Sequence, residues 1–331
     1  MKKLAIAILL VLPVFLAGCF SNNNLSVWPQ DDGTLQTKRV LPAKGKTENR
    51  ILILDIDGII TEMGQGHFFY SEEPTTFEVR QKLDRALRDD SIKAVVLRIN
   101  SPGGGANASD IVYQEIVSYK EQSRVPIVAM MMGVAASGGY YAACAADRIY
   151  AHPNTVTGSI GVISFGLGFD GLFEKIGMES RVVSSGPLKD MGNPFDKWTD
   201  EEKKATQKII DGMFDRFVKV VADSRSMKPE RVREISDGRV MLSREAEELG
   251  LIDDIGYFGD ALDEAMSLAQ IRDAEVILYT KSSKQDRNLY ADAGVQGDVV
   301  PNMGGLTLNN LSAEALLELA RPQVMYLWLG N

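Results

Sequence analysis

A serine in the stretch "GVAASGGYYAACAAD", residues 133–147, is the first candidate for chemistry in this chain. Ser137 has alanines on one side and glycines on the other, and such small residues let another backbone come close. A serine hydroxyl attacks a carbonyl group when a base takes its proton and hydrogen-bond donors stabilise the oxyanion that forms. Ser137 is therefore either a nucleophile or a small residue in a tight joint between a strand and a helix.

Two glycine-rich segments are able to supply the donors. The segment "NSPGGG" exposes backbone N–H groups at Gly103–Gly105, and Gly138 begins the helix expected after Ser137, where the helix dipole favours negative charge. Both segments follow an apolar strand, and ligands of α/β proteins bind at this end of the strands. Because Ala135 stands two positions before Ser137, the pattern is not the G-x-S-x-G elbow. The glycines also match neither common phosphate-binding motif, which argues against nucleotide binding.

Three side chains are candidates for the base that activates this serine. His67 and His152 are the two histidines of the chain, and neither lies in a glycine-rich setting. Lys189 lies in "SSGPLKDMGNPF", residues 184–195, among glycine, proline and apolar residues. A lysine serves as a base when burial leaves it as a neutral amine. The residues alone leave three readings: Lys189 as base, a histidine in a Ser-His-Asp triad, or Lys189 as a surface lysine beside Asp190.

Strands that alternate with helices are expected to position these groups. Three apolar runs predict buried strands, and these are residues 50–60, 92–100 and 125–133. A helix is expected through residues 111–120, with Ser109 or Asp110 as its N-cap. This alternation is typical of an α/β fold with a largely parallel sheet.

A second group of elements is predicted in the later half of the chain. Residues 180–186, "SRVVSSG", are expected to form a strand that leads into the loop of Lys189. A long helix is predicted over residues 199–225, where Thr199 and Glu202 have the spacing of a capping box. The apolar stripe of this helix is expected to face the core, and it comprises Ile209, Ile210, Met213, Phe214 and Phe217.

Composition and charge narrow the class of protein. The 331 residues are 45% hydrophobic and 24% charged, which is ordinary for a folded globular chain. The formal net charge of −9 argues against a nucleic-acid partner, because phosphate contacts need a basic surface. We expect no metal and no organic cofactor.

The N-terminus resembles a bacterial lipoprotein signal, in which the chain is cut before a cysteine that is then acylated. Lys2 and Lys3 precede the apolar run Leu4–Leu16, which is too short for a permanent membrane span, and "LAGC" follows. The alternative is an ordinary secretory signal. The resemblance makes Cys19 the lipidation site, and Phe20 after it is typical of cargo sent to the outer membrane. We therefore expect a lipid-anchored protein of the cell envelope that faces the periplasm or the cell exterior, at the outer rather than the inner membrane if the cell has two.

Five motifs resemble, in this order, the signal peptide peptidase A family of serine peptidases: "LDIDGII", "VLRINSPGGG", "ASGGYYAACAADRIYAHPNTVTGSIGVI", "SSGPLKDMGNPF" and "GRVMLSREAEELGLIDDIG". The resemblance implies an α/β fold of the ClpP/crotonase type, a spiral of packed sheets with flanking helices. It makes Ser137 the nucleophile, Lys189 the general base, and the N–H groups of Gly104 and Gly138 the oxyanion donors. Leu188 departs from the family pattern, in which an aromatic residue often precedes the lysine.

The chain resembles the short, single-repeat form of this family. That form implies a homo-oligomer in which the serine and the lysine meet across a subunit boundary. The implied activity is an endopeptidase that acts on extended apolar peptides, such as cleaved signal peptides or misfolded envelope proteins. Two alternatives are a catalytically silent, membrane-tethered scaffold and an acyl-CoA-handling enzyme of the same superfamily. The N-terminal export signal argues against the acyl-CoA-handling enzyme, because coenzyme A is cytoplasmic.

These inferences divide the chain into four parts: a lipoprotein signal peptide (1–18), a polar tether (19–49), a peptidase domain (50–280) and a mobile C-terminal segment (281–331) whose apolar end is expected to dock. With Cys19 acylated, Cys144 has no cysteine to pair with within the chain. We expect Cys144 to be a small buried apolar residue.

Overall fold

The computed structural model of the chain describes residues 35–63, 65–67, 70–281 and 323–328. The chain divides into two compact units, one of residues 1–36 and 280–285 and the other of residues 37–279 and 286–331. The described helices and the candidate site lie in the second unit. The expected signal peptide and Cys19 lie outside the described residues, whereas residues 35–41 of the expected tether form a strand.

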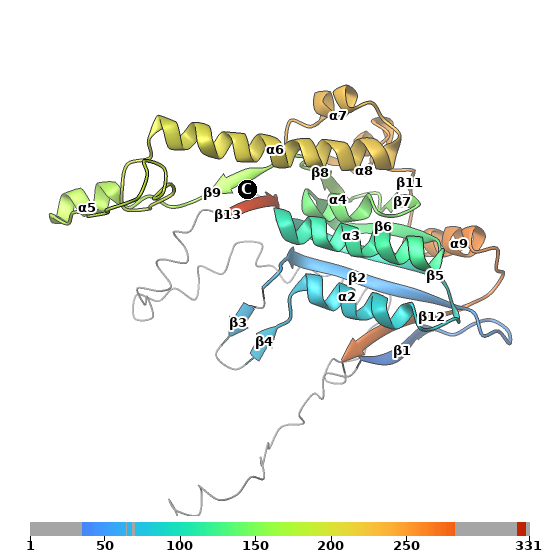
Figure 1. The fold of residues 1–331 in the computed structure, drawn as a ribbon. Helices are drawn as coiled ribbons and strands as arrows, with labels where there is room; N and C mark the ends of the chain where they lie inside the picture. Colours follow the sequence, from blue (N-terminus) through green and yellow to red (C-terminus); the bar gives the residue numbers. More distant parts are fainter. Residues whose placement is uncertain (1–34, 64, 68–69, 282–322, 329–331) are drawn as a thin grey trace, which may run out of the picture. The chain divides into compact units, whose positions relative to one another are not determined.

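Helices and strands alternate along the described chain (Figure 1). The strands are β1 (Leu35–Leu41), β2 (Arg50–Ile60), β3 (Gln65–His67), β4 (Tyr70–Glu72), β5 (Ile92–Gly105), β6 (Ile127–Ala136), β7 (Arg148–Ala151), β8 (Val156–Gly158), β9 (Ile163–Phe165), β10 (Val240–Leu242), β11 (Asp254–Ile255), β12 (Glu275–Lys281) and β13 (Gln323–Leu327). The helices are α2 (Thr75–Ala86), α3 (Ala106–Ser123), α4 (Gly138–Ala143), α5 (Asp170–Ile176), α6 (Asp200–Arg225), α7 (Pro229–Ile235), α8 (Ser243–Glu248) and α9 (Phe258–Leu268).

The centre of the fold is a row of parallel strands in the order β12-β2-β5-β6-β7-β11. Successive residues of β2, such as Ile51 and Leu52, are both buried, so the sheet is covered on both faces. This explains why the strands read as continuous apolar runs rather than as alternating patterns. On one face, Phe258 and Leu262 of α9 join a core cluster that includes Ile51.

The sheet divides at the ends of β5 and β6, next to the glycine-rich segments. The first part of β6 pairs with β7, whereas its last residues, Val134–Ala136, pair with β8. Strand β10 adds to β8 in the antiparallel direction, and β13 adds antiparallel to the end of β5. The result is a large mixed sheet with flanking helices, in agreement with the predicted ClpP/crotonase-like α/β fold.

The predicted N-cap of the helix after β5 is wrong. Helix α3 begins at Ala106, directly after the glycine run, so Ser109 and Asp110 lie inside it. The hydroxyl of Ser109 donates to the carbonyl oxygen of Gly105 at 2.9 Å, and the Asp110 carboxylate accepts from Arg216 of α6 at 2.9 Å. Ser109 thus makes a local contact inside the helix, and Asp110 makes a tertiary contact. A residue pattern typical of an N-cap does not tell these roles apart from capping.

The predicted strand over residues 180–186 is also wrong, because this segment forms neither helix nor strand. Val182 and Val183 are 50% and 102% exposed, and no neighbouring strand pairs with them among the described residues. A β-branched run forms a stable strand only when another strand satisfies its backbone. Here the segment lies outside the sheet.

Helix α6 confirms its predicted capping box, since the Thr199 hydroxyl accepts from the Glu202 N–H and the Thr199 N–H donates to the Glu202 carboxylate. The expected core stripe is confirmed in part. Phe217 is fully buried, whereas Ile209 is 44% exposed. In Figure 1 the first half of α6 extends beyond the strands towards α5, so its apolar side chains have less of the core to pack against.

Candidate active site

Ser137 occupies a strained turn between β6 and α4. Its φ and ψ angles are 51° and −115°, a conformation that L-residues other than glycine rarely adopt. The turn is held by the Ser137 N–H, which donates to the carbonyl oxygen of Gly158 at 2.8 Å, and by the N–H of Tyr141, which donates to the Ser137 carbonyl at 2.9 Å. Ser137 is 1% exposed. The α/β-hydrolases also carry their nucleophilic serine on a strained strand-to-helix turn, which there presents the hydroxyl to the substrate.

The run of glycines at the end of β5 is needed because neighbouring backbone atoms leave no space for side chains. Gly103 has a φ angle of 104°, and a Cβ built on it would lie 2.0 Å from the carbonyl oxygen of Tyr326. A Cβ built on Gly104 would lie 2.1 Å from the carbonyl oxygen of Ile60. Side chains are therefore excluded at both positions, and the backbone of the run is open to close approach by another strand.

The two glycine-rich segments meet. A Cβ on Gly103 would lie 2.7 Å from the backbone nitrogen of Gly138, and one on Gly138 would lie 3.1 Å from the Cα of Gly103. The structure thus places Ser137, Gly104 and Gly138 at one point of the fold, the carboxyl ends of β5 and β6. Backbone N–H groups that converge beside a serine are able to stabilise an oxyanion formed on a bound carbonyl.

Lys189 is not part of this cluster within one chain. It lies in a turn between α5 and α6, it is exposed, and its N–H donates to the carbonyl oxygen of Gly186 at 3.1 Å. Within the described chain, no hydrogen bond or ion pair joins its ammonium group to another residue. In Figure 1, α5 and the coils that follow it lie at the outer end of α6, away from α4.

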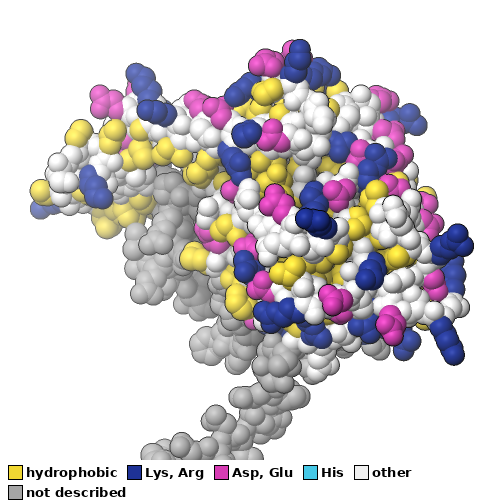
Figure 2. All heavy atoms as spheres, turned by 45° about the vertical axis from the view of Figure 1, so that its right-hand side comes forward, with side chains coloured by type: hydrophobic (Ala, Val, Ile, Leu, Met, Phe, Trp, Pro, Cys, Tyr) yellow, Lys and Arg dark blue, Asp and Glu magenta, His cyan; other side chains and the backbone are white. Residues whose placement is uncertain are grey.

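The segment that carries Lys189, residues 166–199, is here named the arm. It is held together by its own contacts: Phe173 stacks on Phe195 with ring centroids 4.6 Å apart, and Phe169 donates its N–H to Pro194. Among its charged residues it also exposes several hydrophobic side chains, which include Leu172, Ile176, Met178, Val183, Leu188 and Trp198. Figure 2 shows hydrophobic side chains gathered at this end of the molecule. Exposed apolar patches are common at sites that contact another protein, a membrane or a ligand.

The histidines give no support for a triad. His152 follows β7, where its ring packs edge-on against Tyr257 at 5.2 Å and its Nδ1 atom accepts from the N–H of Asn154 at 3.2 Å. His67 lies in β3, in a part of the chain whose side chains are not described. Cys144 is buried and free, as predicted, and burial raises the pKa of its thiol to about 12.

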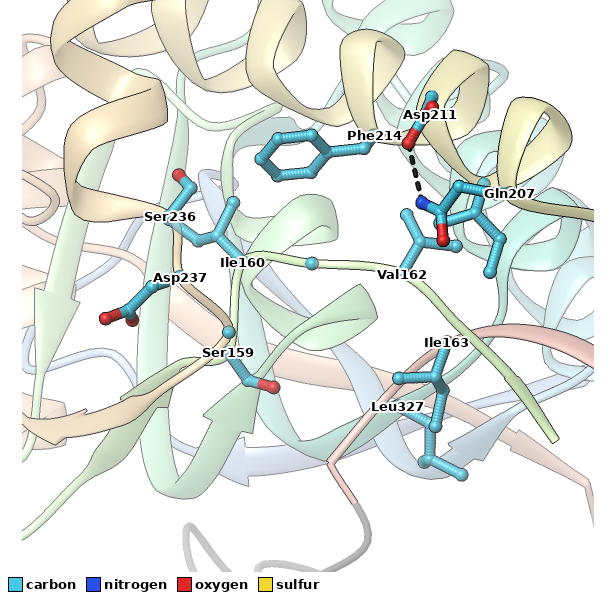
Figure 3. A pocket seen from close by; sticks show the side chains of 13 residues that line it. Ser159, Ile160, Val162, Ile163, Gln207, Asp211, Phe214, Ser236, Asp237 and Leu327 are labelled. Atoms are coloured by element: carbon cyan, nitrogen blue, oxygen red, sulfur yellow. Dashed lines mark hydrogen bonds between the residues drawn. The ribbon is translucent and has the colours of Figure 1, made fainter. Parts of the chain in front are cut away.

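A cavity of about 320 Å³ lies beside the turn of Ser137 (Figure 3). One wall is the segment that follows Gly158, another is the outer half of α6, including Phe214, and Leu327 of β13 closes one side. The lining begins at Ser159, the residue after Gly158, whose carbonyl oxygen accepts the hydrogen bond from the Ser137 N–H. The cavity offers space for a peptide that continues past this point.

The described residues contain neither a membrane-spanning helix nor a metal site. No helix there is long and apolar enough to cross a bilayer. No group of three or more His, Cys, Asp or Glu side chains there is placed to hold a metal ion.

Comparisons with known proteins identify the family. The model of peptidase family S49 matches residues 119–272, and the Clp protease model matches residues 72–157. A protein of Enterococcus faecium named "Putative signal peptide peptidase SppA" is 39% identical over 236 residues, which are 71% of this chain and 68% of that protein. The chain belongs to peptidase family S49. It is a serine peptidase of the SppA type with a single S49 domain, and the matched range contains Ser137 and Lys189.

Two further relatives match over a smaller part of their own length. "Protease 4" of Salmonella typhi is 33% identical over 232 residues, which are 70% of this chain and 37% of that protein. "Serine protease SPPA, chloroplastic" of Arabidopsis thaliana is 36% identical over 192 residues, which are 58% of this chain and 28% of that protein. The matched region thus spans about a third of these two proteins.

Sequence reasoning missed two side chains next to this site. Tyr141 of α4 and Phe217 of α6 contact Tyr326 of β13. Tyr141 was visible inside the motif "ASGGYY", but its role depends on β13, which lies nearly two hundred residues further along the chain.

Proposed function

We propose that the chain is a lipid-anchored endopeptidase in which Ser137 is the nucleophile and Lys189 of a second copy is the general base. The observation that supports this best is the strained, buried turn of Ser137 beside the N–H groups of Gly104 and Gly138. A position with backbone strain persists where the surrounding structure holds it, and such positions cluster at active sites.

The proposed reaction needs no group beyond these residues and water. The neutral amine of Lys189 takes the proton of the Ser137 hydroxyl as Oγ attacks the carbonyl carbon of the substrate. The N–H groups of Gly104 and Gly138 stabilise the oxyanion, and removing one such donor costs about 3–4 kcal/mol in comparable sites. Lys189 then gives its proton to the leaving amine. Water, deprotonated by the same amine, hydrolyses the acyl-enzyme and restores the serine hydroxyl.

A second copy is proposed because the arm exposes both the base and an apolar surface. Val183 and Trp198 on the arm are 102% and 53% exposed, and Lys189 lies between them in the sequence. If the arm packs against the Ser137 face of another copy, this apolar surface is buried and Lys189 is enclosed. Burial disfavours the charged form of an amine. A general base must be in the neutral form to accept a proton.

The proposed localisation and the proposed substrates are supported by the sequence alone. The lipoprotein-type N-terminus with Cys19 supports a lipid anchor, and with it a position at the membrane of the cell envelope, facing the periplasm. Phe20 favours the outer membrane over the inner one. The proposed substrates are extended, apolar peptides, such as cleaved signal peptides or segments of misfolded envelope proteins. These would lie along the glycine run at the end of β5.

Complementation between inactive copies tests the dyad. The full chain, in detergent micelles, is assayed on apolar fluorogenic peptides beside Ser137→Ala, Lys189→Ala and the control Lys197→Ala, which changes another lysine of the arm. Each dyad variant is expected to lose at least about 1,000-fold in turnover, whereas Lys197→Ala stays active. Co-assembly of the two inactive variants is expected to restore turnover, because one pairing joins the intact Ser137 of one copy to the intact Lys189 of the other.

Three outcomes would contradict this proposal in different ways. Wild-type turnover in either dyad variant would remove that residue from the mechanism. Normal assembly without complementation would place the dyad within one chain. A wild-type chain that assembles but is inactive on every peptide would favour the silent scaffold.

A further inference from the structure

Ser101 of β5 is a buried polar residue next to the glycine run, and it takes no part in the proposed proton transfers. It is 0% exposed and lies two residues before Gly103. Buried hydroxyl groups in proteins are as a rule hydrogen-bonded, so the partners of this one show what it holds in place. Because a hydroxyl donates one hydrogen bond and accepts up to two, Ser101 is able to join separate backbone segments.

The hydroxyl of Ser101 bridges two strands that lie side by side in Figure 1, β2 and β5. It donates to the carbonyl oxygen of Gly58 in β2 at 2.6 Å, and it accepts from the N–H of Gly103 at 3.1 Å. The second contact closes a turn around Pro102, which has no N–H of its own. One side chain thus fixes the start of the glycine run to the neighbouring strand.

This bridge lies where the regular pairing of β5 is interrupted. The register of β5 shifts at this point against β2 and also against β6. At such a bulge the ladder of backbone hydrogen bonds is disrupted and the strand bends. Side chains supply hydrogen bonds here: Asn100 donates to the Asp57 carboxylate at 3.0 Å and accepts from the N–H of Val134 in β6 at 3.2 Å. The course of the glycine run therefore depends on the side chains of Asn100 and Ser101 as well as on the ladders.

Ser101 also contacts the helix that carries the second proposed oxyanion donor. A Cβ built on Gly139 of α4 would lie 2.6 Å from the Ser101 carbonyl oxygen and 3.3 Å from the Ser101 Cβ, so the first turn of α4 packs directly on Ser101. Gly138, whose N–H is the proposed donor, precedes Gly139 in that turn. Ser101 thus binds the residue before one donor, Gly104, and packs against the residue after the other.

The bond from Gly103 to Ser101 engages one of the N–H groups of the glycine run. Because the Gly103 N–H donates to the Ser101 hydroxyl, it already has a partner within the chain. The φ angle of 104° at Gly103 turns the backbone between this N–H and the next one. The Gly104 N–H is therefore the first of the run that is able to face a bound carbonyl group, which supports its role as the donor.

We propose that Ser101 is a positioning residue for the oxyanion site: its hydroxyl sets the backbone of Gly103, and through it the place of the Gly104 N–H relative to Gly138. This inference rests on the proposed peptidase function and adds a residue to its site. Donors that are already in place stabilise the charge that develops in the transition state, whereas the uncharged carbonyl group of the bound peptide needs them less. Loss of the Ser101 hydroxyl should therefore slow the chemical step more than it weakens peptide binding.

Kinetics on the full chain in detergent micelles separate positioning from stability. Ser101→Ala is expected to lower kcat at least about 10-fold and to leave KM within about 2-fold of the wild type. Ser243→Ala is the matched control, because Ser243 is 1% exposed and its hydroxyl donates to the Pro153 carbonyl oxygen at 2.7 Å. Both variants leave a backbone group without its partner and are expected to lower the melting temperature. Ser243→Ala should nevertheless keep the wild-type kcat.

A peptide aldehyde gives a readout that a purely structural role would not change. The Ser137 Oγ adds to the aldehyde carbon, Lys189 takes the hydroxyl proton, and the carbonyl oxygen becomes an oxyanion that needs the donors. The matching peptide alcohol binds without this step. We expect Ser101→Ala to raise the Ki of the aldehyde by about the factor by which it lowers kcat/KM, with the Ki of the alcohol unchanged. Ser101→Cys, whose thiol is a weaker donor and acceptor, should lie between Ser101→Ala and the wild type.

The failure of this inference differs from the failure of the peptidase function. Wild-type kcat and aldehyde Ki in Ser101→Ala, or in Ser101→Cys where the alanine variant does not fold, would overturn the positioning role and leave the peptidase function standing. A higher KM and a higher Ki of the alcohol with kcat unchanged would overturn it too, as would an equal loss of kcat in Ser243→Ala. A wild type that turns over no peptide and binds aldehyde and alcohol equally would mean that the peptidase function itself fails.

Discussion

At the scale of single residues, the candidate site depends on one position with a strained backbone and on two positions where no side chain fits. Ser137 keeps a backbone conformation that costs about 1–3 kcal/mol for a residue with a Cβ. Gly104 and Gly138 have no room for a Cβ, because neighbouring backbone or side-chain atoms would lie within 2.1 and 2.3 Å of it. Tight packing of this kind fixes the position of the backbone donors, and an oxyanion site requires donors that are already in place.

Two glycine-to-alanine substitutions compare a glycine that the site requires with a glycine that has free space around it. Gly104→Ala places a Cβ 2.1 Å from the Ile60 carbonyl oxygen, so β2 and β5 must move apart. We expect a loss of about 1–3 kcal/mol in the free energy of unfolding and a fall in turnover of about 100-fold or more. Gly212→Ala, in the middle of α6, meets no atom within 4 Å and should add about 0.5–1 kcal/mol of stability.

Denaturant unfolding and peptide turnover measure both effects. Gly212→Ala should keep wild-type turnover, since Gly212 contributes to neither the site nor the cavity. Wild-type stability and turnover in Gly104→Ala would mean that the glycine run does not need its close contacts.

The identities of the site residues were predictable from the sequence, because small residues around Ser137 and a glycine run after a strand are local patterns. Their convergence was expected from the rule that strand ends meet at one edge of a parallel sheet, and the structure agrees for Ser137, Gly104 and Gly138. The strained conformation of Ser137 was not predictable, because it depends on hydrogen bonds to residues 4 and 21 positions away, Tyr141 and Gly158. The meeting of Lys189 with Ser137 of a second copy was expected from the family resemblance alone, because no local pattern encodes a contact between chains, and it stays a prediction.

At the scale of elements, α6 is tied to the sheet at its C-terminal end by a largely buried ion pair. Arg225 donates to both oxygens of the Asp253 carboxylate at 3.0 Å, and the N–H of Ile149 donates to it at 2.7 Å. The side chains of Arg225 and Asp253 are 11% and 16% exposed. Burial alone would raise the pKa of Asp253, but these hydrogen bonds and the charge of Arg225 outweigh it and lower the pKa below 3.8.

Acid should therefore weaken the fold through Asp253. A carboxyl group whose pKa is lowered by folding contributes stability above its unfolded pKa, and this contribution is lost as the pH falls through the folded pKa. We expect the midpoint of denaturant unfolding to fall as the pH drops below 3.8, with a smaller fall in Asp253→Asn. At pH 7, Asp253→Ala should lose about 2–4 kcal/mol, because Arg225 is left without its partner. An equal acid dependence in Asp253→Asn and the wild type would contradict this assignment.

Local patterns predicted the elements well where the sheet supports them, and less well at its margins. The runs of β2, β5 and β6 are strands because both faces of each are covered. Residues 180–186 have the composition of a strand but no neighbour to pair with among the described residues, and Ile209 of α6 lies beyond the sheet that would bury it. The position of β13 follows from pairing with β5, more than two hundred residues away, and sequence periodicity carries no information about such pairing.

At the scale of the whole molecule, the arm presents apolar side chains that the described residues of its own chain leave exposed. A folded chain with exposed apolar residues on one segment gains free energy when a second copy buries them. In the proposed assembly, the same contact that buries this surface also delivers Lys189 to Ser137. Assembly and catalysis are then coupled, so that a change on the outer face of the arm should lower turnover without touching either catalytic side chain.

Val183→Asp tests this coupling, because Val183 is fully exposed and has no packing to lose among the described residues. A charge at the centre of an apolar interface disfavours association. Sedimentation velocity in detergent is therefore expected to show smaller assemblies, with at least about a 10-fold loss of turnover and an unchanged circular dichroism spectrum. Met63→Asp, which changes another exposed apolar residue outside the arm, should leave both unchanged. A Val183→Asp chain that is monomeric and fully active would show that each chain completes its own site, because catalysis would then proceed without a neighbour's lysine.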